Sequence, residues 1–137
     1  METHDYRSRF AREPLVEPLS ADELRDLNAH DIGFGPHIGL VITACSAERT
    51  EGYVEVGPQH LQLTGVVNGG VYASIGETIG SMAAIAAAGR PALGMSNYTD
   101  LLGGVSGGRI EAVARPVHTG KRTHLSVSYT HLRAHET

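Results

Sequence analysis

The amino-acid sequence predicts an α+β fold, in which an antiparallel sheet wraps around one long central helix. Two extended stretches, 39–47 and 52–56, are joined by the turn 48–51 and predict a hairpin. A helical stretch then runs from residue 69 or 70 to about residue 88. Three further extended stretches follow, at 92–102, at 109–118 and from 123 onwards. This order is typical of a helix packed on one face of an antiparallel sheet.

The N-terminal part predicts a short helix behind a loose lead-in. Residues 1–19 carry mixed charge and two prolines, which are typical of a weakly ordered terminus. The run Ser20-Ala21-Asp22-Glu23 has capping-box spacing, in which Ser20 and Glu23 accept hydrogen bonds from free N–H groups at a helix start. The helix is expected to end near Asn28. The predicted domain therefore spans residues 20–126.

Composition indicates one globular domain and excludes several functional classes. The 137 residues carry a net charge of −4, with 41% hydrophobic and 19% charged residues, which suits a single domain with a core. A nucleic-acid binder would need a basic face that this balance does not supply. The eight histidines are scattered without metal-ligand spacing, so no metal site is expected.

The chain is expected to act in the cytoplasm without a membrane partner. Its first residues are charged and show no signal peptide, and no apolar run is expected to approach the length of a membrane span, about 20 residues. The one cysteine, Cys45, lies in an apolar stretch and is expected to be buried.

The long helix carries two apolar stripes and one charge. Small residues recur at Gly69, Ala73, Gly76, Gly80, Ala83 and Ala87, and bulkier ones at Val71, Ile75, Ile79, Met82 and Ile85. A helix that is apolar nearly all round is expected to be buried. Glu77 is the only charged residue between Gln62 and Arg90. It is either a functional carboxylate or a structural glutamate paired with an arginine across an interface.

The start of this helix is a candidate anion site. In Asn68-Gly69-Gly70, the glycines leave backbone N–H groups bare at the positive end of the helix dipole. An oxyanion that develops on a carbonyl would be stabilised there. The alternative is an ordinary helix cap, because asparagine is a common N-cap residue.

The stretch from His60 to Ser81 resembles the signature of hotdog thioesterases of the phenylacetyl-CoA/4-hydroxybenzoyl-CoA (PaaI-like) type. In that pattern, an amide residue, a glycine, an acidic residue and a serine or threonine follow one another at spacings of seven, eight and four. Gln62, Gly69, Glu77 and Ser81 fit all three spacings. The pairing of Glu with Gln is similar to the 4-hydroxybenzoyl-CoA branch. The resemblance covers about residues 30–125, and Asn68 stands where the family usually has histidine.

The resemblance implies hydrolysis of an acyl-CoA thioester at sites shared between two chains of a homodimer or homotetramer. The Gly69 N–H would polarise the thioester carbonyl, and Glu77 would attack it or activate a water. Gln62 would position the carbonyl or the water, and Ser81 would orient Glu77 or the hydrolytic water. Asn68 takes the place of that histidine, and its amide can still donate a hydrogen bond and cap the helix. No cofactor is implied, because coenzyme A is part of the substrate.

Further residues are implied in substrate binding. The turn 118–123 resembles the family's turn near the nucleotide of coenzyme A, where Lys121 and Arg122 would hold phosphates beside Thr123. A solvated basic turn is the alternative. Gly70 at the helix start, and Asn97 and Thr99 on the expected strand after the helix, are the remaining candidates for contact with the substrate.

The last 11 residues, 127–137, do not continue the family pattern. They resemble a translated sequencing adapter, and a natural variant tail is the alternative. The closing strand of the sheet is therefore expected to be lost or replaced, which would expose an edge.

Two other functions compete with thioester hydrolysis. A non-catalytic acyl-CoA-binding module is favoured by the Asn68 departure and the atypical tail. An acyl-CoA hydratase of the same fold would carry an Asp and His pair on a differently patterned segment, which the sequence lacks. The acyl group, the choice between dimer and tetramer, and the choice between nucleophile and general base for Glu77 stay open.

Overall fold

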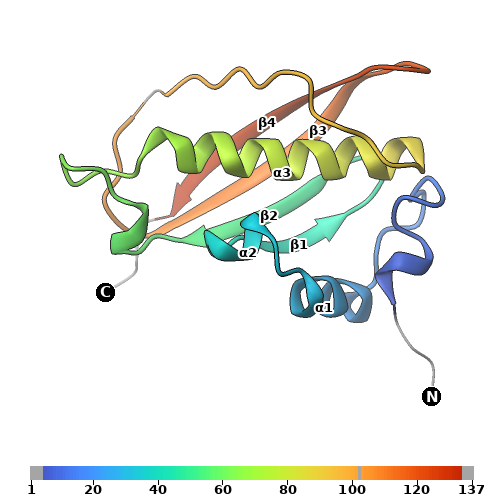
Figure 1. The fold of residues 1–137 in the computed structure, drawn as a ribbon, viewed down its shortest axis with the longest axis horizontal. Helices are drawn as coiled ribbons and strands as arrows, with labels where there is room; N and C mark the ends of the chain where they lie inside the picture. Colours follow the sequence, from blue (N-terminus) through green and yellow to red (C-terminus); the bar gives the residue numbers. More distant parts are fainter. Residues whose placement is uncertain (1–4, 102, 134–137) are drawn as a thin grey trace.

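The computed structural model describes residues 5–101 and 103–133, and its centre is one antiparallel sheet of four strands in the order β1-β2-β3-β4. The strands are β1 (Val41–Cys45), β2 (Thr50–Glu55), β3 (Arg109–Thr119) and β4 (His124–Arg133). The long helix α3 (Gly69–Ala88) lies across one face of this sheet (Figure 1). The predicted α+β architecture is confirmed.

The ends of α3 follow from local chemistry that the sequence reveals. At the start, the Asn68 side chain accepts a hydrogen bond of 2.8 Å from the Gly70 N–H. At the end, Gly89 takes a left-handed conformation with φ of 72°, which glycine adopts without steric cost, and its N–H donates to the Ile85 carbonyl. The predicted bounds of the helix are therefore confirmed.

The core lies between the inner face of the sheet and one face of α3. Alternate β3 residues Ile110, Ala112 and Ala114 are buried, as expected for a strand with one covered face. The helix residues that share this core are Val71, Ile75, Ile79, Ala83 and Ala86. Cys45 is also fully buried, as predicted.

The expectation that α3 is buried on nearly all sides is wrong for the protomer. Glu77 is exposed, and Met82 and Ile85 are only half-buried. The reason is that the sheet covers only one face of the helix and leaves Glu77, with its neighbours Ala73, Gly76 and Gly80, outside the core.

The helix is also more apolar than the sequence analysis allowed. By length and composition, Gly69–Ala88 could cross a membrane, with a mean hydropathy of 1.2. That corrects the expectation that no run approaches a span. Core helices share this composition, and the packing of α3 on β2, β3 and β4 accounts for it.

The lead-in before residue 20 is not loose where the structure describes it. Leu15 is fully buried; its N–H donates to the Ala86 carbonyl and its carbonyl accepts from the Ala47 N–H, both at 2.8 Å. Arg9 forms an ion pair of 2.8 Å with Glu23. Local sequence patterns do not predict this packing, because the partners lie far along the chain.

The first elements agree with the prediction except in detail. Helix α1 (Ala21–His30) starts at the predicted Ser20–Glu23 capping box and runs two residues beyond Asn28. A one-turn helix α2 (Phe34–His37) and the short 3-10 turns η1 (Tyr6–Ser8) and η2 (Pro58–His60) were not predicted. The β1–β2 turn lies at residues 46–49, two residues earlier than expected, because the Ser46 N–H already bonds the Arg49 carbonyl and Thr50 belongs to β2.

The strand expected at 92–102 is absent from the described part of that stretch. Residues 91–101 run extended along α3, from its C-terminal end back toward its N-terminal end (Figure 1). An extended backbone becomes a strand only when a neighbouring strand supplies a hydrogen-bonded ladder. Here the polar contact that fixes the segment goes to the helix instead, as described below.

The closing strand does form, and in this respect the expectation of its loss is wrong. β4 pairs with β3 along its whole length, from Thr119 opposite His124 to Arg109 opposite Arg133. Residues 127–133 of the atypical tail therefore take part in the sheet. A ladder uses backbone groups, which do not depend on side-chain identity. However, none of the side chains at 124–130 is buried, and Leu125 and Tyr129 are 58% and 68% exposed. Residues 134–137 lie outside the described part.

Candidate active site

Glu77 and Ser81 form the polar centre of the uncovered face of α3. They are one helical turn apart, and the Ser81 hydroxyl donates a hydrogen bond of 3.4 Å to Glu77 Oε1. Glu77 is exposed and Ser81 is half-buried in the protomer. A serine in this position orients one carboxylate oxygen and leaves the other available to a ligand.

The extended segment 91–101 passes directly over this carboxylate. A Cβ atom built on Gly94 would lie 2.5 Å from Glu77 Oε1, so the Gly94 backbone itself forms one wall around Glu77. The Asn97 amide donates 2.8 Å to the Ala73 carbonyl, which ties the segment to the helix. The Thr99 hydroxyl in turn donates 2.9 Å to Asn97 Oδ1.

A groove of about 1310 Å³ lies between α3, the segment 90–101 and β4. Six predicted site residues line it: Glu77, Ser81, Asn97, Thr99, Arg122 and Thr123. Five others do not: Gln62, Asn68, Gly69, Gly70 and Lys121. One protomer therefore brings together the carboxylate and part of the substrate-binding set, but not the helix N-terminus or the amide residue.

Gln62 sits on a small hairpin that leads into α3. The Gln62 N–H donates 2.8 Å to the Val66 carbonyl, and Leu61 pairs with Val67. Its side-chain amide is exposed and donates 2.8 Å to the Thr64 hydroxyl. The amide is thus held within its own loop.

The helix N-terminus is partly covered by Leu101. A Cβ atom on Gly69 would lie 2.5 Å from a Leu101 methyl group. Among the described residues, none accepts a hydrogen bond from the Gly69 N–H. The Gly70 carbonyl accepts 2.7 Å from the Ser74 hydroxyl.

Gly69 and Glu77 cannot serve one carbonyl group from the same helix. They are eight residues apart, which places them about 12 Å apart along the helix axis. A nucleophile or base and an oxyanion donor must each lie about 3 Å from the reacting group. Within one protomer the predicted pair is therefore divided.

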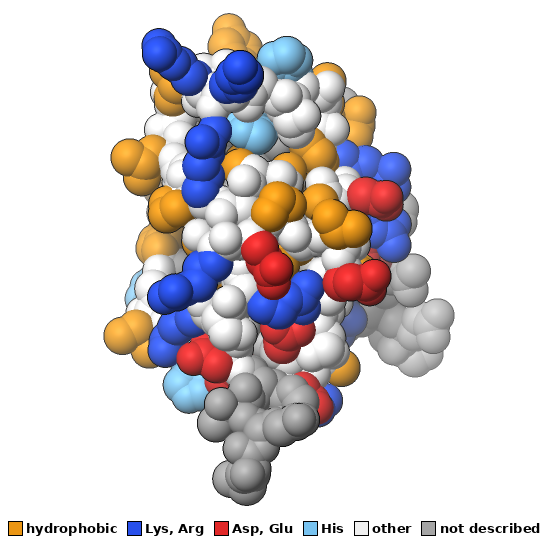
Figure 2. Space-filling view, turned by 90° about the vertical axis from the view of Figure 1, so that its right-hand side faces the viewer, with side chains coloured by type: hydrophobic (Ala, Val, Ile, Leu, Met, Phe, Trp, Pro, Cys, Tyr) orange, Lys and Arg blue, Asp and Glu red, His pale blue; other side chains and the backbone are white. Residues whose placement is uncertain are grey.

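The other end of the groove is basic. The β3–β4 turn is closed by a hydrogen bond of 2.9 Å from the Gly120 N–H to the Thr123 carbonyl. Lysine and arginine side chains gather at the end of the molecule where this hairpin ends (Figure 2). Arg122 lines the groove, whereas the carbonyl of Lys121 accepts a hydrogen bond from the Arg90 guanidinium.

Three groove residues escaped the sequence analysis. Arg90 follows the helix cap directly, and only folding brings it to the β3–β4 turn. His124 lines the groove with its Nδ1 buried and without a hydrogen-bond partner among the described residues. Burial raises the pKa of the phenol of Tyr72, which also lines the groove. No sequence signal distinguished these three from ordinary surface positions.

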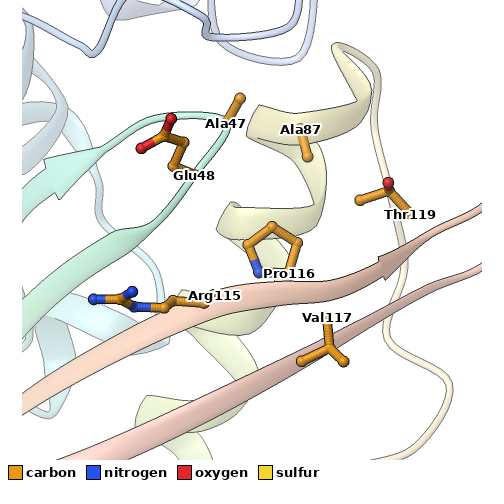
Figure 3. Close-up of a pocket in the computed structure, with 7 residues that line it drawn as sticks. All are labelled: Ala47, Glu48, Ala87, Arg115, Pro116, Val117 and Thr119. Atoms are coloured by element: carbon orange, nitrogen blue, oxygen red, sulfur yellow. The ribbon is translucent and has the colours of Figure 1, made fainter.

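A second hollow of about 570 Å³ lies between the β1–β2 turn, the end of α3 and β3 (Figure 3). It is lined by Ala47, Glu48, Ala87, Arg115, Pro116, Val117 and Thr119. None of the predicted site residues lines it. Over the described parts of the chain, no group of three or more His, Cys, Asp or Glu side chains is placed to hold a metal ion.

Comparison with known proteins identifies the family. A family model described as the thioesterase superfamily matches residues 64–127. Rv1847 of Mycobacterium tuberculosis (strain ATCC 25618 / H37Rv), a provisionally assigned esterase, is 37% identical over 111 residues, which cover 77% of this chain and 79% of that protein. The proofreading thioesterase EntH of Cronobacter sakazakii (strain ATCC BAA-894) is 30% identical over 103 residues, which cover 73% and 75%.

Solved structures of similar proteins have the same fold as this chain. The structure of Rv1847/MT1895 superposes with a TM-score of 0.71 at 36% identity, covering 72% of this chain and 82% of that one. A mutant of thioesterase PA1618 from Pseudomonas aeruginosa gives a TM-score of 0.72 at 25% identity, covering 82% and 84%. The chain belongs to the thioesterase superfamily. It has the hotdog fold of that family, and its class of activity is the hydrolysis of thioesters or esters.

Proposed function

We propose that this protein hydrolyses acyl-CoA thioesters to a free acid and coenzyme A. One observation carries the substrate assignment: a single groove is lined by the Glu77 carboxylate and by the basic side chains of Arg90 and Arg122. The helix between Glu77 and its end at Ala88 spans about 16 Å. Acyl-CoA has matching chemistry, with a thioester at one end of an extended arm and phosphates at the other.

The proposed active form is a homodimer, or a homotetramer made of two such dimers, with each site built from two chains. The separation of about 12 Å between Gly69 and Glu77 along one helix supports this arrangement. Glu77 of one protomer would act on a carbonyl held by the Gly69 N–H of its partner. Glu77 is exposed in the protomer although Gly94 lies beside it, so its carboxylate is open to such an approach.

Glu77 can perform the hydrolysis in two ways. As a general base, it takes a proton from water; the hydroxide adds to the thioester carbon, the C–S bond breaks, and the proton passes to the thiolate. As a nucleophile, its oxygen displaces coenzyme A and forms a mixed anhydride, which water then opens. In both cases the oxyanion is stabilised at the helix N-terminus, where Gly69 contributes its N–H.

The other predicted residues take supporting roles in this proposal. Gln62 would orient the carbonyl or water, and Ser81 would orient Glu77, to which it already donates. Asn68 caps the helix that carries Gly69, and Gly70 exposes its backbone there. These assignments rest on the family resemblance and on the local contacts given above.

Substrate binding is assigned to both sides of the groove. Asn97 and Thr99 would line the channel for the arm of coenzyme A, and Thr123 lies beside Arg122 at the phosphate end. Lys121 would add charge from outside the groove. We propose a cytoplasmic location, where a single buried cysteine is typical, and no cofactor or metal.

The test is release of coenzyme A, followed with a thiol reagent, over a panel of aliphatic and aromatic acyl-CoA thioesters. Glu77→Gln keeps the shape of the side chain and removes its charge, so kcat should fall by about 10²–10⁴ with KM little changed. Gly107→Ala is the control, because a Cβ there meets nothing within 4 Å and the residue lies outside the groove. Tight acyl-CoA binding without turnover by the wild type would assign a binding module instead.

A further inference from the structure

We propose that His60 is a positioning residue: its buried imidazole holds the hairpin 60–68 and thereby sets the place of both Gln62 and the N-terminus of α3. The inference rests on the proposed function for its catalytic consequence. Its structural part, a clamp made by one imidazole, stands on contacts of its own.

The imidazole of His60 is buried, with 2% exposure, and both of its nitrogens are used. Nδ1 accepts a hydrogen bond of 2.9 Å from the Gly57 N–H. Nε2 lies 2.7 Å from the Ile38 carbonyl, which can only accept. The ring is therefore the neutral tautomer with its proton on Nε2. It ties the turn at Gly57 to Ile38, the C-cap residue of α2.

The backbone of His60 forms the base of the hairpin. Its carbonyl accepts 2.8 Å from the N–H of Asn68, the N-cap of α3. The next rungs are the Leu61–Val67 pair and the hydrogen bond of 2.8 Å from the Gln62 N–H to Val66. Gln62 thus stands two residues from the clamp on one arm, and Gly69 follows the end of the other arm.

Through these contacts, the His60 side chain fixes the position of two proposed catalytic groups, the Gln62 amide and the Gly69 N–H. The imidazole links this hairpin to Ile38 through a buried hydrogen bond, and its partly buried bond to Gly57 adds to the backbone bond of 3.0 Å from the His60 N–H to the Gly57 carbonyl. Its loss leaves at least one buried backbone group unsatisfied. A tilt of the hairpin then moves Gln62 and the Gly69 N–H together. A displacement of about 1 Å at a reacting centre can cost roughly 100-fold in rate.

Two substitutions separate the two halves of the clamp. His60→Asn places an acceptor near the position of Nδ1 and lacks the donor to Ile38, whereas His60→Gln reaches toward Ile38 and lacks the acceptor for Gly57. Each should lower kcat by about 10-fold or more. KM should change by less than about threefold, because the basic end of the groove is remote from the hairpin. His30→Asn on α1 is the control, since His30 is exposed.

Two spectroscopic readouts distinguish positioning from simple loss of stability. ¹⁵N NMR of the wild type should show His60 protonated on Nε2 and bare on Nδ1. Hydrogen exchange should become faster at the amides of Gln62 and Asn68 in the variants and stay unchanged at the β2–β3 ladder. A merely structural role would lower the melting temperature and leave kcat per folded molecule unchanged.

The proposal is overturned by folded His60 variants with wild-type kcat, or by a proton on Nδ1. If neither variant folds, the wild type decides: fast exchange at Gln62 and Asn68 overturns a rigid clamp, and slow exchange supports it. Failure of the proposed function looks different. An active Glu77→Gln enzyme would remove the thioesterase mechanism and leave the tautomer and the exchange pattern of His60 intact.

Discussion

Gly94 lies so close to Glu77 that no side chain fits between them: a Cβ atom at position 94 would be 2.5 Å from Oε1 and 3.0 Å from Oε2 of Glu77. The atoms that would have to move are the end of a flexible side chain. Gly94→Ala should therefore displace the Glu77 carboxylate and leave the backbone in place. We expect kcat to fall by at least about 10-fold, in line with a displaced base, with little change in melting temperature.

The control for this prediction is Gly107→Ala, because a Cβ there meets nothing within 4 Å and the residue lies outside the groove. Steady-state kinetics and thermal unfolding of both variants are the measurements. A Gly94→Ala enzyme with unchanged kcat would show that the position of Glu77 under this segment does not matter for turnover.

Arg122 and Lys121 are adjacent basic residues with different surroundings, and they provide a matched pair. Arg122 lines the groove and Lys121 does not. Arg122→Ala should raise KM for an acyl-CoA by about 10-fold and leave kcat unchanged. The reason is that a contact with the phosphates stabilises the bound substrate and the transition state equally. Lys121→Ala should have a smaller effect.

A truncated thioester gives the internal check on that prediction. An acyl-pantetheine lacks the nucleotide phosphates, so Arg122→Ala should leave its KM nearly unchanged. An equal rise of KM for both substrates would show that Arg122 does not bind phosphate.

Sites shared between chains predict recovery of activity in mixed dimers. Glu77→Gln and Gln62→Ala should each be nearly inactive alone. After the two are unfolded and refolded together in equal amounts, half of the dimers are mixed and half of the sites in each mixed dimer are intact. About a quarter of wild-type activity should then return. If Glu77 and Gln62 of the same chain formed each site, mixing would recover nothing.

Glu23, which caps α1, is expected to make a pH-dependent contribution to the free energy of unfolding. Burial acts to raise the pKa of Glu23, but hydrogen bonds from the Ser20 N–H and from Arg9, with the charge of Arg9, outweigh it and lower the pKa. A group with a lowered pKa in the folded state stabilises the fold above its unfolded pKa, and this stability is lost as the pH falls through its folded pKa.

Glu23→Gln should therefore lower the free energy of unfolding by about 1 kcal/mol at pH 7. The difference from wild type should shrink as the pH falls below the usual glutamate range near 4.3. Glu13→Gln removes the exposed partner of the same Arg9 and should have little effect. Denaturant unfolding at several pH values is the measurement, and a constant difference at all of them would contradict the assignment.

Local sequence patterns predicted most of the fold. Helix ends depend on neighbouring residues, so they can be predicted from the sequence. This holds for the capping box at Ser20 and Glu23, for the start of α3 after Asn68 and for its end at Gly89. The spacing of Gln62, Gly69, Glu77 and Ser81 likewise indicated the thioesterase family, which comparison with relatives then confirmed.

What escaped prediction depends on contacts between distant residues. Leu15 looks like part of a polar terminus until its backbone meets Ala86 and Ala47. The stretch after α3 has the composition of a strand, yet without a ladder partner it lies along the helix and is anchored through Asn97. Similarly, residues 127–133 form a strand because backbone pairing accepts almost any side chain.

The sequence by itself determined the family, the helix that carries Glu77, and the hydrogen-bonding capacity of each candidate residue, because these depend on residue identity and short spacings. Tertiary structure alone decided that Glu77 faces outward beneath Gly94 and that Arg90 joins Arg122 in the same groove. It alone seated His60 between Gly57 and Ile38. A groove is a property of distances across the fold, and no pattern along the chain encodes which remote backbone group a side chain will reach.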